Sequence, residues 1–316
     1  MIISASRRTD IPAWFSDWFL YRLREKYALV RNPVNSRQVS RIDLSPDIVD
    51  CIVFWSKNPR PMLDKLEQLQ PYPFYFQFTL NAYGKDVEPN LPSLEERIDT
   101  FRALSCRLGK HRVIWRYDPI LLTPDYSVFW HEEQFSYLAE KLSPYTEMCT
   151  FSFLDFYAKI RKRLKTLEIQ DMNQKQQCII AQKLARIAHF YSIQINTCGE
   201  ELDLSPYQID HASCIDPLLI SRLTGYSLDV KKDKNQRPAC GCVSSIDLGL
   251  YHTCRHECLY CYANCNSRIQ ERNASLYDPS SPLLCSHLTE EDKLTERQVK
   301  SLRVSYPSSP LQIPET

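Results

Sequence analysis

Three cysteines near the C-terminal end of this 316-residue chain have the spacing of a metal-binding loop. Cys254, Cys258 and Cys261 form a C-x3-C-x2-C pattern directly after a short apolar run. Three thiolates on one loop can ligate three irons of a [4Fe–4S] cluster and leave the fourth iron open. The same thiolates could instead hold a structural zinc ion together with His252, His256 or another cysteine. Reduced thiols without a metal are the third alternative.

A second group of cysteines lies just before this loop in the sequence. It comprises Cys198, Cys214, Cys240 and Cys242. Four thiols near one end of a fold could hold an auxiliary iron–sulfur cluster or a zinc ion, and Cys265 could replace one of them. Because their spacing is irregular, buried and inert thiols are the alternative.

The composition places limits on the compartment and on the partners. Thirteen cysteines, clustered in a chain of this size, favour metal binding over a disulfide framework. The N-terminus has its apolar residues before its charges, which is the wrong order for a secretory signal, and no apolar run is long enough to cross a bilayer. A formal net charge of +1 favours neither a nucleic acid nor a membrane as partner. We therefore expect a cytoplasmic protein without a membrane partner.

Short apolar runs that alternate with helical patterns predict an α/β fold. The runs at 2–6, 51–55, 75–80, 112–117, 150–154, 193–197 and 243–248 are typical of strands covered on both faces. Helices are predicted at 14–24, after a capping box at 93–96, at 175–190 and from Asp216-Pro217 onward. Strands that alternate with helices indicate parallel βαβ units. We expect a TIM-like (β/α) barrel, complete or partial, with a doubly wound open sheet as the alternative.

The domain boundaries follow from breaks in this pattern. Residues 1–270 are expected to form the barrel, with the cysteine loop at 254–261 and a β-hairpin insertion at 28–43. After about residue 270 the chain becomes rich in serine and proline. Residues 271–316 are therefore expected to form a C-terminal extension that packs on the barrel, with a short helix near 290–301.

Polar side chains follow several of the predicted strands, at the end of a parallel barrel where functional groups gather. These candidate site residues are Ser6, Arg7, Arg8, Asp10, Lys57 and Arg116. Because loops are polar in any protein, each residue alone is a weak prediction, and the set together is the stronger one.

The cysteine loop resembles that of the radical S-adenosylmethionine (radical SAM) superfamily, whose pattern has an aromatic residue before the third cysteine, as Tyr260 is here. The loop is also similar to that of the spore photoproduct lyase-like branch. The segments at 9–12, 56–59, 88–89 and 117–120 resemble further elements of that branch. In the branch, however, the loop follows the first strand, whereas here it follows the last, so the resemblance implies a circularly permuted radical SAM barrel. Almost the whole chain also resembles an uncharacterised bacterial family with a C-terminal cysteine cluster, which brings no known substrate.

The resemblance implies a chemistry and a role for each candidate residue. A one-electron donor such as flavodoxin or ferredoxin would reduce a [4Fe–4S] cluster, which would cleave S-adenosylmethionine so that a hydrogen atom is taken from an unknown substrate. Tyr260 would pack at the adenine, and Asp10 or Ser6 would meet the amino group. Lys57 and Arg116 would meet the carboxylate or an anionic substrate, for which Arg7 and Arg8 are the best candidates.

Two other functions stay open at this point. The first is nucleic-acid repair of the spore photoproduct lyase type, for which the basic runs at 159–163 and 231–237 could contact phosphates. The balanced net charge does not favour it. The second is a non-catalytic barrel that holds zinc or an iron–sulfur cluster and binds a partner.

Overall fold

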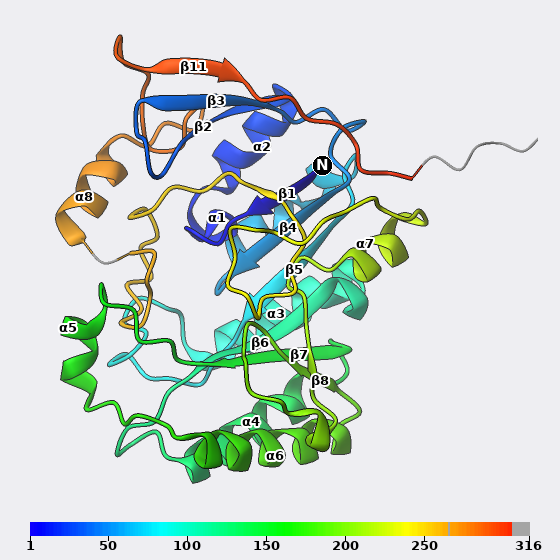
Figure 1. Ribbon diagram of the computed structural model, residues 1–316, viewed down its shortest axis with the longest axis vertical. Coiled ribbons are helices and arrows are strands. Elements are labelled where there is room, and N and C mark those ends of the chain that lie inside the picture. The colour runs from blue at the N-terminus through cyan, green and yellow to red at the C-terminus, as the bar shows by residue number, and fades with distance from the viewer. Residues whose placement is uncertain (265, 305–316) are drawn as a thin grey trace, which may run out of the picture.

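Eight parallel strands form the central sheet of the computed structural model, which describes residues 1–264 and 266–304 (Figure 1). Their order is β10 (Ile246–Asp247), β1 (Ile2–Ala5), β4 (Cys51–Ser56), β5 (Phe74–Thr79), β6 (Val113–Ile120), β7 (Met148–Phe153), β8 (Gln194–Thr197) and β9 (Asp210–His211). The predicted α/β class and parallel sheet are confirmed. Among the described residues, the hydrogen bonds between strands do not close this sheet into a complete barrel.

The sheet is buried on both faces, as the continuous apolar runs predict. Ile3, Phe54 and Phe76 belong to the larger core cluster. This cluster also contains buried residues of α2 (Ser16–Arg24), α3 (Leu94–Leu108), α4 (Val128–Leu142) and α6 (Gln174–Phe190). The alternate residues of the same strands, such as Val53 and Tyr75, pack in a second cluster with residues of the segment 214–243, including Ile220 of α7 (Pro217–Thr224). One face of the sheet is therefore covered by helices, and the other is covered by α7 and irregular chain.

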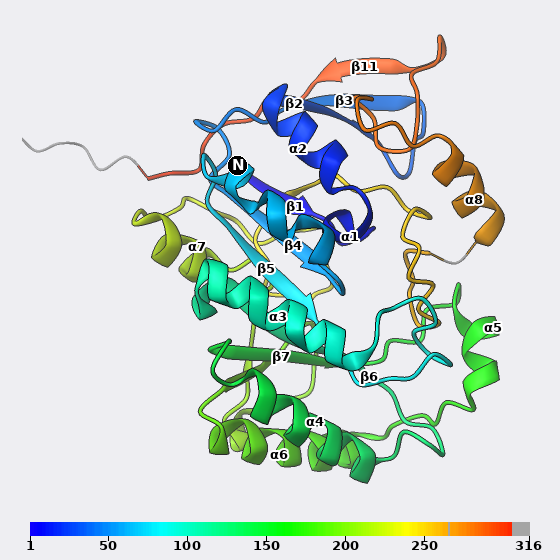
Figure 2. The same ribbon diagram turned by 180° about the vertical axis from the view of Figure 1, so that it is seen from behind.

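The helices of the described chain lie around the main sheet, and most of the longer ones lie along one side of it (Figure 2). The helices are α1 (Ile11–Trp14), α2 (Ser16–Arg24), α3 (Leu94–Leu108), α4 (Val128–Leu142), α5 (Arg161–Leu164), α6 (Gln174–Phe190), α7 (Pro217–Thr224) and α8 (Ser267–Ser275), with a 3-10 helix η1 at Arg60–Leu69. Figure 2 shows α3 in front of the sheet, with α2 and α4 along the same side. Figure 1, from the opposite side, shows the chain between α7 and α8 crossing the other face.

The predicted helix starts are present. Ser93 accepts a hydrogen bond from Glu96 N at 3.3 Å, and the Glu96 side chain accepts one from Ser93 N at 2.9 Å, so the capping box is confirmed. Asp216 caps α7 through Leu218 N at 2.8 Å, with Pro217 in the first turn. No helix within 1–264 or 266–304 is long and apolar enough to cross a membrane.

A separate three-stranded sheet lies beside the main one. The predicted hairpin insertion is confirmed, because β2 (Tyr27–Arg31) and β3 (Gln38–Asp43) pair in antiparallel register. The helix expected near 290–301 is wrong, since β11 (Lys293–Glu296) forms a strand parallel to β3 there. The free edge of β3 offers unpaired backbone groups, and pairing with it outweighs the weak local preference of this polar segment for a helix.

The C-terminal extension packs on α2 and on the middle of β2. Trp18 Nε1 donates to Ser281 O at 2.8 Å, and Arg22 donates to Ser280 O at 2.8 Å. Leu29 N donates to Pro282 O at 2.9 Å. The extension begins within α8, and its last expected residues, 305–316, lie outside the described part of the chain.

Candidate functional site

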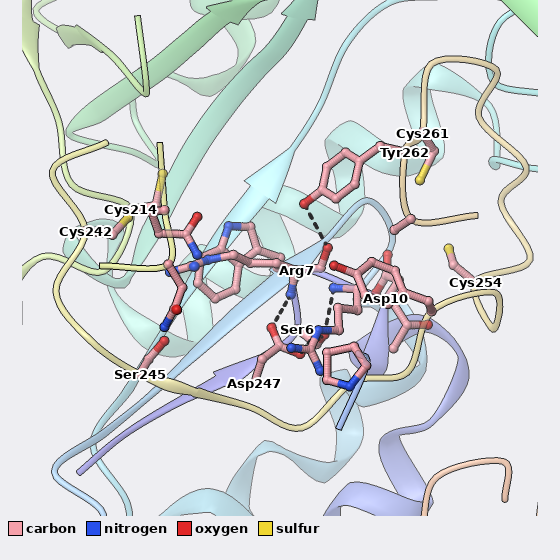
Figure 3. Close-up of a pocket in the computed structure, with 18 of the residues that line it drawn as sticks. Ser6, Arg7, Asp10, Cys214, Cys242, Ser245, Asp247, Cys254, Cys261 and Tyr262 are labelled. Atoms are coloured by element: carbon pink, nitrogen blue, oxygen red, sulfur yellow. Dashed lines mark hydrogen bonds and ion pairs between the residues drawn. The ribbon is translucent and has the colours of Figure 1, made fainter. Parts of the chain in front are cut away.

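A cavity of about 910 Å³ lies at the carboxyl ends of the parallel strands. His252, a zinc-ligand candidate, is not among the lining residues. The other described candidates do line the cavity, namely Ser6, Arg7, Arg8, Asp10, Lys57, Arg116, Cys198, Cys214, Cys240, Cys242, Cys254, His256, Cys258, Tyr260 and Cys261. Figure 3 shows Cys214 and Cys242 at one side of this pocket, and Cys254 and Cys261 at the other, with Arg7 and Asp247 between them. The two cysteine groups therefore belong to two ends of one cavity.

The cysteine loop leaves β10 and is held by its own backbone and by neighbouring segments. Cys261 N donates to Cys258 O at 3.0 Å, which forms a tight turn between these two ligand candidates. Arg163 of α5 donates to the carbonyls of Cys261 and Asn264. The sulfur atoms of Cys254 and Cys261 point toward each other in Figure 3. The loop thus presents its thiols to one region of the cavity.

The three thiols of this loop are in a low-dielectric environment. Burial raises the pKa of Cys254, Cys258 and Cys261. At Cys258 the ammonium of Lys57 opposes this shift, because a nearby positive charge favours the thiolate. Metal binding would have to displace these protons, so the affinity for a metal should rise with pH.

Asp10 connects the cysteine loop to the strand ends. Its Oδ1 accepts hydrogen bonds from Ala13 N at 3.0 Å and Ser56 Oγ at 2.7 Å. Its Oδ2 accepts one from Lys57 N at 2.8 Å and lies 2.9 Å from His256 Nε2. Burial would raise the pKa of Asp10, but the interactions with His256, together with the hydrogen bonds from Lys57 N and Ser56, outweigh burial and lower the pKa. Both carboxylate oxygens are thus occupied by the protein, and the predicted contact with an amino group would have to displace one of these partners.

Glu88 holds the side chains of Lys57 and Tyr260 in the neighbourhood of Cys258. Its Oε1 accepts a hydrogen bond from Lys57 Nζ at 2.8 Å and another from the Tyr260 hydroxyl, and its Oε2 lies 3.3 Å from Arg97 Nη1. Burial would raise the pKa of Glu88, but the two cations outweigh burial and lower the pKa. Lys57 also lies 5.2 Å from the centre of the Tyr260 ring. Lys57 and Tyr260 are therefore fixed by a buried carboxylate, which the sequence prediction missed.

Asp247 at the end of β10 connects that strand to β1. It accepts hydrogen bonds from Ser4 Oγ at 2.6 Å, Ser6 Oγ at 2.7 Å and Arg7 N at 2.8 Å. The Arg8 guanidinium lies 4.0 Å from it. Ser6 and Arg8 are therefore both in contact with one carboxylate at the floor of the cavity.

Arg7 and Arg116 are two of the three arginines that were predicted to bind anions. Both extend toward the second cysteine group. Arg116 donates to Cys214 Sγ at 2.8 Å and pairs with Asp118 at 2.6 Å. Arg7 lies 3.8 Å from Asp233, and its Nη2 is buried without a hydrogen-bond partner. Arg116 is thus neutralised by the protein, whereas Arg7 keeps a donor available.

Three lining side chains have buried polar atoms without a partner among the described residues. These atoms are Arg7 Nη2, Thr9 Oγ1 and His256 Nδ1. A buried polar atom that is left unpaired costs about 1–3 kcal/mol, so a native structure rarely keeps several around one cavity. Arg7 Nη2, Thr9 Oγ1 and His256 Nδ1 are therefore the buried polar atoms that the described protein leaves unused among the lining residues.

Metal-ion geometry is not pre-formed in the part of the chain that the structure describes. Within 1–264 and 266–304, no three His, Cys, Asp or Glu side chains are already arranged around a common point as ligands of a single metal ion. In the second cysteine group, Cys198 Sγ and Cys214 Sγ are 2.9 Å apart, which is closer than two ligands of one ion. Cys265, which the sequence offered as a substitute ligand, lies outside the described residues.

The two basic runs are engaged in intramolecular contacts. Arg163 of the first run donates to the cysteine loop, as described above, and Arg237 of the second pairs with Asp155. These contacts hold the runs against the rim of the cavity. They leave fewer free cations for phosphates than the sequence suggested.

Comparison with known proteins gives a family. The family model described as "Domain of unknown function (DUF1848)" matches residues 2–263. This chain belongs to the DUF1848 family. The matched residues include all eight strands of the main sheet and both cysteine groups. The DUF1848 description carries no activity or cofactor, so the resemblance to the radical SAM superfamily stays a prediction.

Other comparisons add little to the DUF1848 match. No curated protein matches the chain. One solved structure, a Bacteroides thetaiotaomicron protein described as a candidate alpha-L-fucosidase, is similar at 13% identity and a TM-score of 0.27, over 57% of this chain and 72% of that chain. A likeness at that TM-score carries no argument about the fold or the function of this DUF1848 protein.

Proposed function

We propose that this protein is an iron–sulfur enzyme of the radical SAM type, acting on an unknown substrate. One observation carries the proposal: Cys254, Cys258 and Cys261, in the C-x3-C-x2-C pattern, line a cavity at the carboxyl ends of a parallel sheet. Functional groups of parallel α/β proteins gather at this edge. Tyr260, the aromatic residue of the pattern, lines the same cavity.

The finer fold belongs to the same proposal. We regard the sheet as a partial (β/α) barrel of the radical SAM kind that is circularly permuted. The strand order supports this, because β1, β4, β5, β6, β7 and β8 follow one another in sequence and the late strand β10 pairs beside β1. Relinking of neighbouring strands is tolerated when the chain ends lie near each other. The cysteine loop then follows the strand before β1 in space, as in the resembling branch.

The donor set fits a [4Fe–4S] cluster. Thiolates are the ligands that such clusters use, and three of them on one loop leave one iron without a protein ligand. Lys57 stands beside Cys258, where its positive charge favours the thiolate form. Arg7, Thr9 and His256 offer unpaired polar atoms to a polar molecule bound beside the three cysteines.

Such a cluster, once reduced by a one-electron donor, supplies the chemistry that splits S-adenosylmethionine and starts a radical reaction on the substrate. The residues of the chain would bind and orient the cofactor and the substrate, and they would exclude water from the site. Glu88 fixes the Tyr260 ring, which can pack against a base, and it fixes Lys57 at Cys258. Asp10 holds His256, and with it the loop between Cys254 and Cys258.

Arg7 is the best candidate to bind an anionic group of a ligand. Its guanidinium keeps an unpaired donor, and it lines the cavity between the two cysteine groups. A guanidinium that donates to a carboxylate or phosphate forms a strong, charge-assisted hydrogen bond. We also place the protein in the cytoplasm, because none of its twelve described cysteines is in a disulfide, as is usual in a reducing compartment.

The test is anaerobic reconstitution with iron and sulfide, followed by incubation with dithionite and S-adenosylmethionine. We expect bound iron, a brown protein and release of 5′-deoxyadenosine. A Cys254→Ala/Cys258→Ala/Cys261→Ala variant should release none, while Cys106→Ala, which changes an exposed thiol, should behave as wild type. The absence of bound iron in the wild type, or equal release by the triple variant, would overturn the proposal.

A further inference from the structure

The four cysteines of the second group lie close together. Cys198 Sγ lies 2.9 Å from Cys214 Sγ. Ile215 N, next to Cys214, donates to Cys242 Sγ at 3.4 Å, and Ser213 Oγ donates to Gly241 O, between Cys240 and Cys242, at 2.7 Å. All four cysteines line the same end of the cavity. Cys214, Cys240 and Cys242 are each at most 6% exposed.

Three separate segments bring these sulfurs together. Cys198 follows β8, Cys214 follows β9 and precedes α7, and Cys240 and Cys242 flank Gly241 in the irregular chain before β10. A side chain at Gly241 would meet the Ser213 hydroxyl at 2.7 Å, so the segments approach one another closely there. Convergence of distant segments on four thiols is typical of a structural metal site rather than of isolated core cysteines.

The surroundings of these four cysteines favour thiolates. Arg116 Nη1 donates to Cys214 Sγ at 2.8 Å, and Ile215 N donates to Cys242 Sγ at 3.4 Å. The Arg7 side chain extends toward the same sulfurs. Inert core thiols need neither cations nor N–H donors, whereas sulfurs that carry negative charge are stabilised by both.

We infer that Cys198, Cys214, Cys240 and Cys242 bind one tetrahedral zinc ion, which is independent of the proposed cluster. Sulfur ligands of zinc at about 2.3 Å lie roughly 3.8 Å from each other, so Cys198 and Cys214 would separate by about 1 Å on binding. A cubane cluster would require a far larger separation, because irons and sulfides then stand between the cysteines. On binding, four S–H protons leave and four Zn–S bonds form. The tetrathiolate site then carries two negative charges, which face Arg7 and Arg116.

The proposed zinc ion would hold an irregular segment of the chain against the main sheet. Between α7 and β10, residues 225–245 contain isolated bridges but no helix or strand of their own, yet they cover one face of the strands. Long segments without regular structure rarely stay fixed unless something fastens them. Zinc at these cysteines would fasten this segment to the ends of β8 and β9, and so shape one wall of the cavity.

The test uses the full chain with Cys254, Cys258 and Cys261 all changed to alanine, so that the proposed cluster cannot contribute. Titration with Co²⁺ without oxygen should give one ion per chain and the visible absorption of a tetrahedral cobalt tetrathiolate, and Zn²⁺ should displace it. Adding Cys214→Ser and Cys242→Ser should abolish that spectrum, whereas adding Cys106→Ser should leave it unchanged. A Co²⁺ spectrum without thiolate bands in the triple variant would overturn the inference.

A second measurement on the wild-type chain guards against variants that fail to fold. Zinc-loaded native protein should protect four more thiols from a thiol reagent than the same protein treated with a chelator. Equal reactivity, or a disulfide between Cys198 and Cys214 in reduced, zinc-supplied protein, would overturn the inference. These two experiments measure neither bound iron nor cleavage of S-adenosylmethionine. A failure of the zinc inference can therefore be distinguished from a failure of the proposed function.

Discussion

Replacing Glu88 by glutamine removes a buried negative charge that Lys57, Arg97 and Tyr260 share. The Glu88 side chain is 1% exposed and that of Arg97 3%, so water cannot take over the lost interaction. Removing one partner of a buried ion pair typically costs 3–5 kcal/mol, and here two cations lose their partner. We therefore expect about 4 kcal/mol, which lowers Tm by roughly 6 °C for a chain of this size.

The assay is thermal unfolding followed by circular dichroism at neutral pH. Glu140→Gln is the matched control, because Glu140 pairs with Lys141 on the surface and such pairs contribute about 0–1 kcal/mol. Its Tm should therefore stay within about 1–2 °C of the wild type. A Glu88→Gln protein with the same Tm as the Glu140→Gln control would refute the claim that Glu88 organises this side of the cavity.

Two further predictions concern pH and the cysteine loop. Burial lowers the pKa of His131 to about 4, below its unfolded value near 6.5, so the stability present above pH 6.5 should be lost as the pH falls toward 4, by up to about 3 kcal/mol. The fall in Tm between pH 7.5 and 4.5 should be smaller in His131→Gln, and an unchanged fall would contradict this. Arg163→Ala removes two hydrogen bonds to loop carbonyls, so a chelator should strip iron from the reconstituted variant several-fold faster than from Lys162→Ala. Equal rates would count against the role of Arg163.

Seven of the eight strands of the main sheet could be predicted because parallel strands are buried on both faces and therefore appear as continuous apolar runs. The short strand β9 was not predicted, because both of its residues are polar and exposed. β11 could not be predicted either, because its residues are polar and exposed, and it becomes a strand only where it meets the free edge of β3. A helix was expected after the cysteine loop, but the bounds of α8 could not be predicted for a related reason, since Gln270 is its only buried residue and its sequence has no apolar stripe.

The candidate site, like the fold, could be predicted from the sequence only in part. Strand ends identified the lining residues, because topology alone brings them to one edge. Sequence could not show that Glu88 would meet Tyr260, which is 172 residues away, or that both oxygens of Asp10 would be taken by protein groups. The gathering of four irregularly spaced cysteines at one end of the cavity likewise depends on loops whose paths have no sequence period.

The central claim is that Cys254, Cys258 and Cys261 leave one iron open to S-adenosylmethionine. Electron paramagnetic resonance of the reconstituted and reduced protein, recorded with and without S-adenosylmethionine, tests it most directly. We predict a [4Fe–4S]⁺ signal that changes when S-adenosylmethionine is added, and no such signal from the Cys254→Ala/Cys258→Ala/Cys261→Ala variant. A signal that S-adenosylmethionine leaves unchanged, or a signal that survives in the triple variant, would contradict the account.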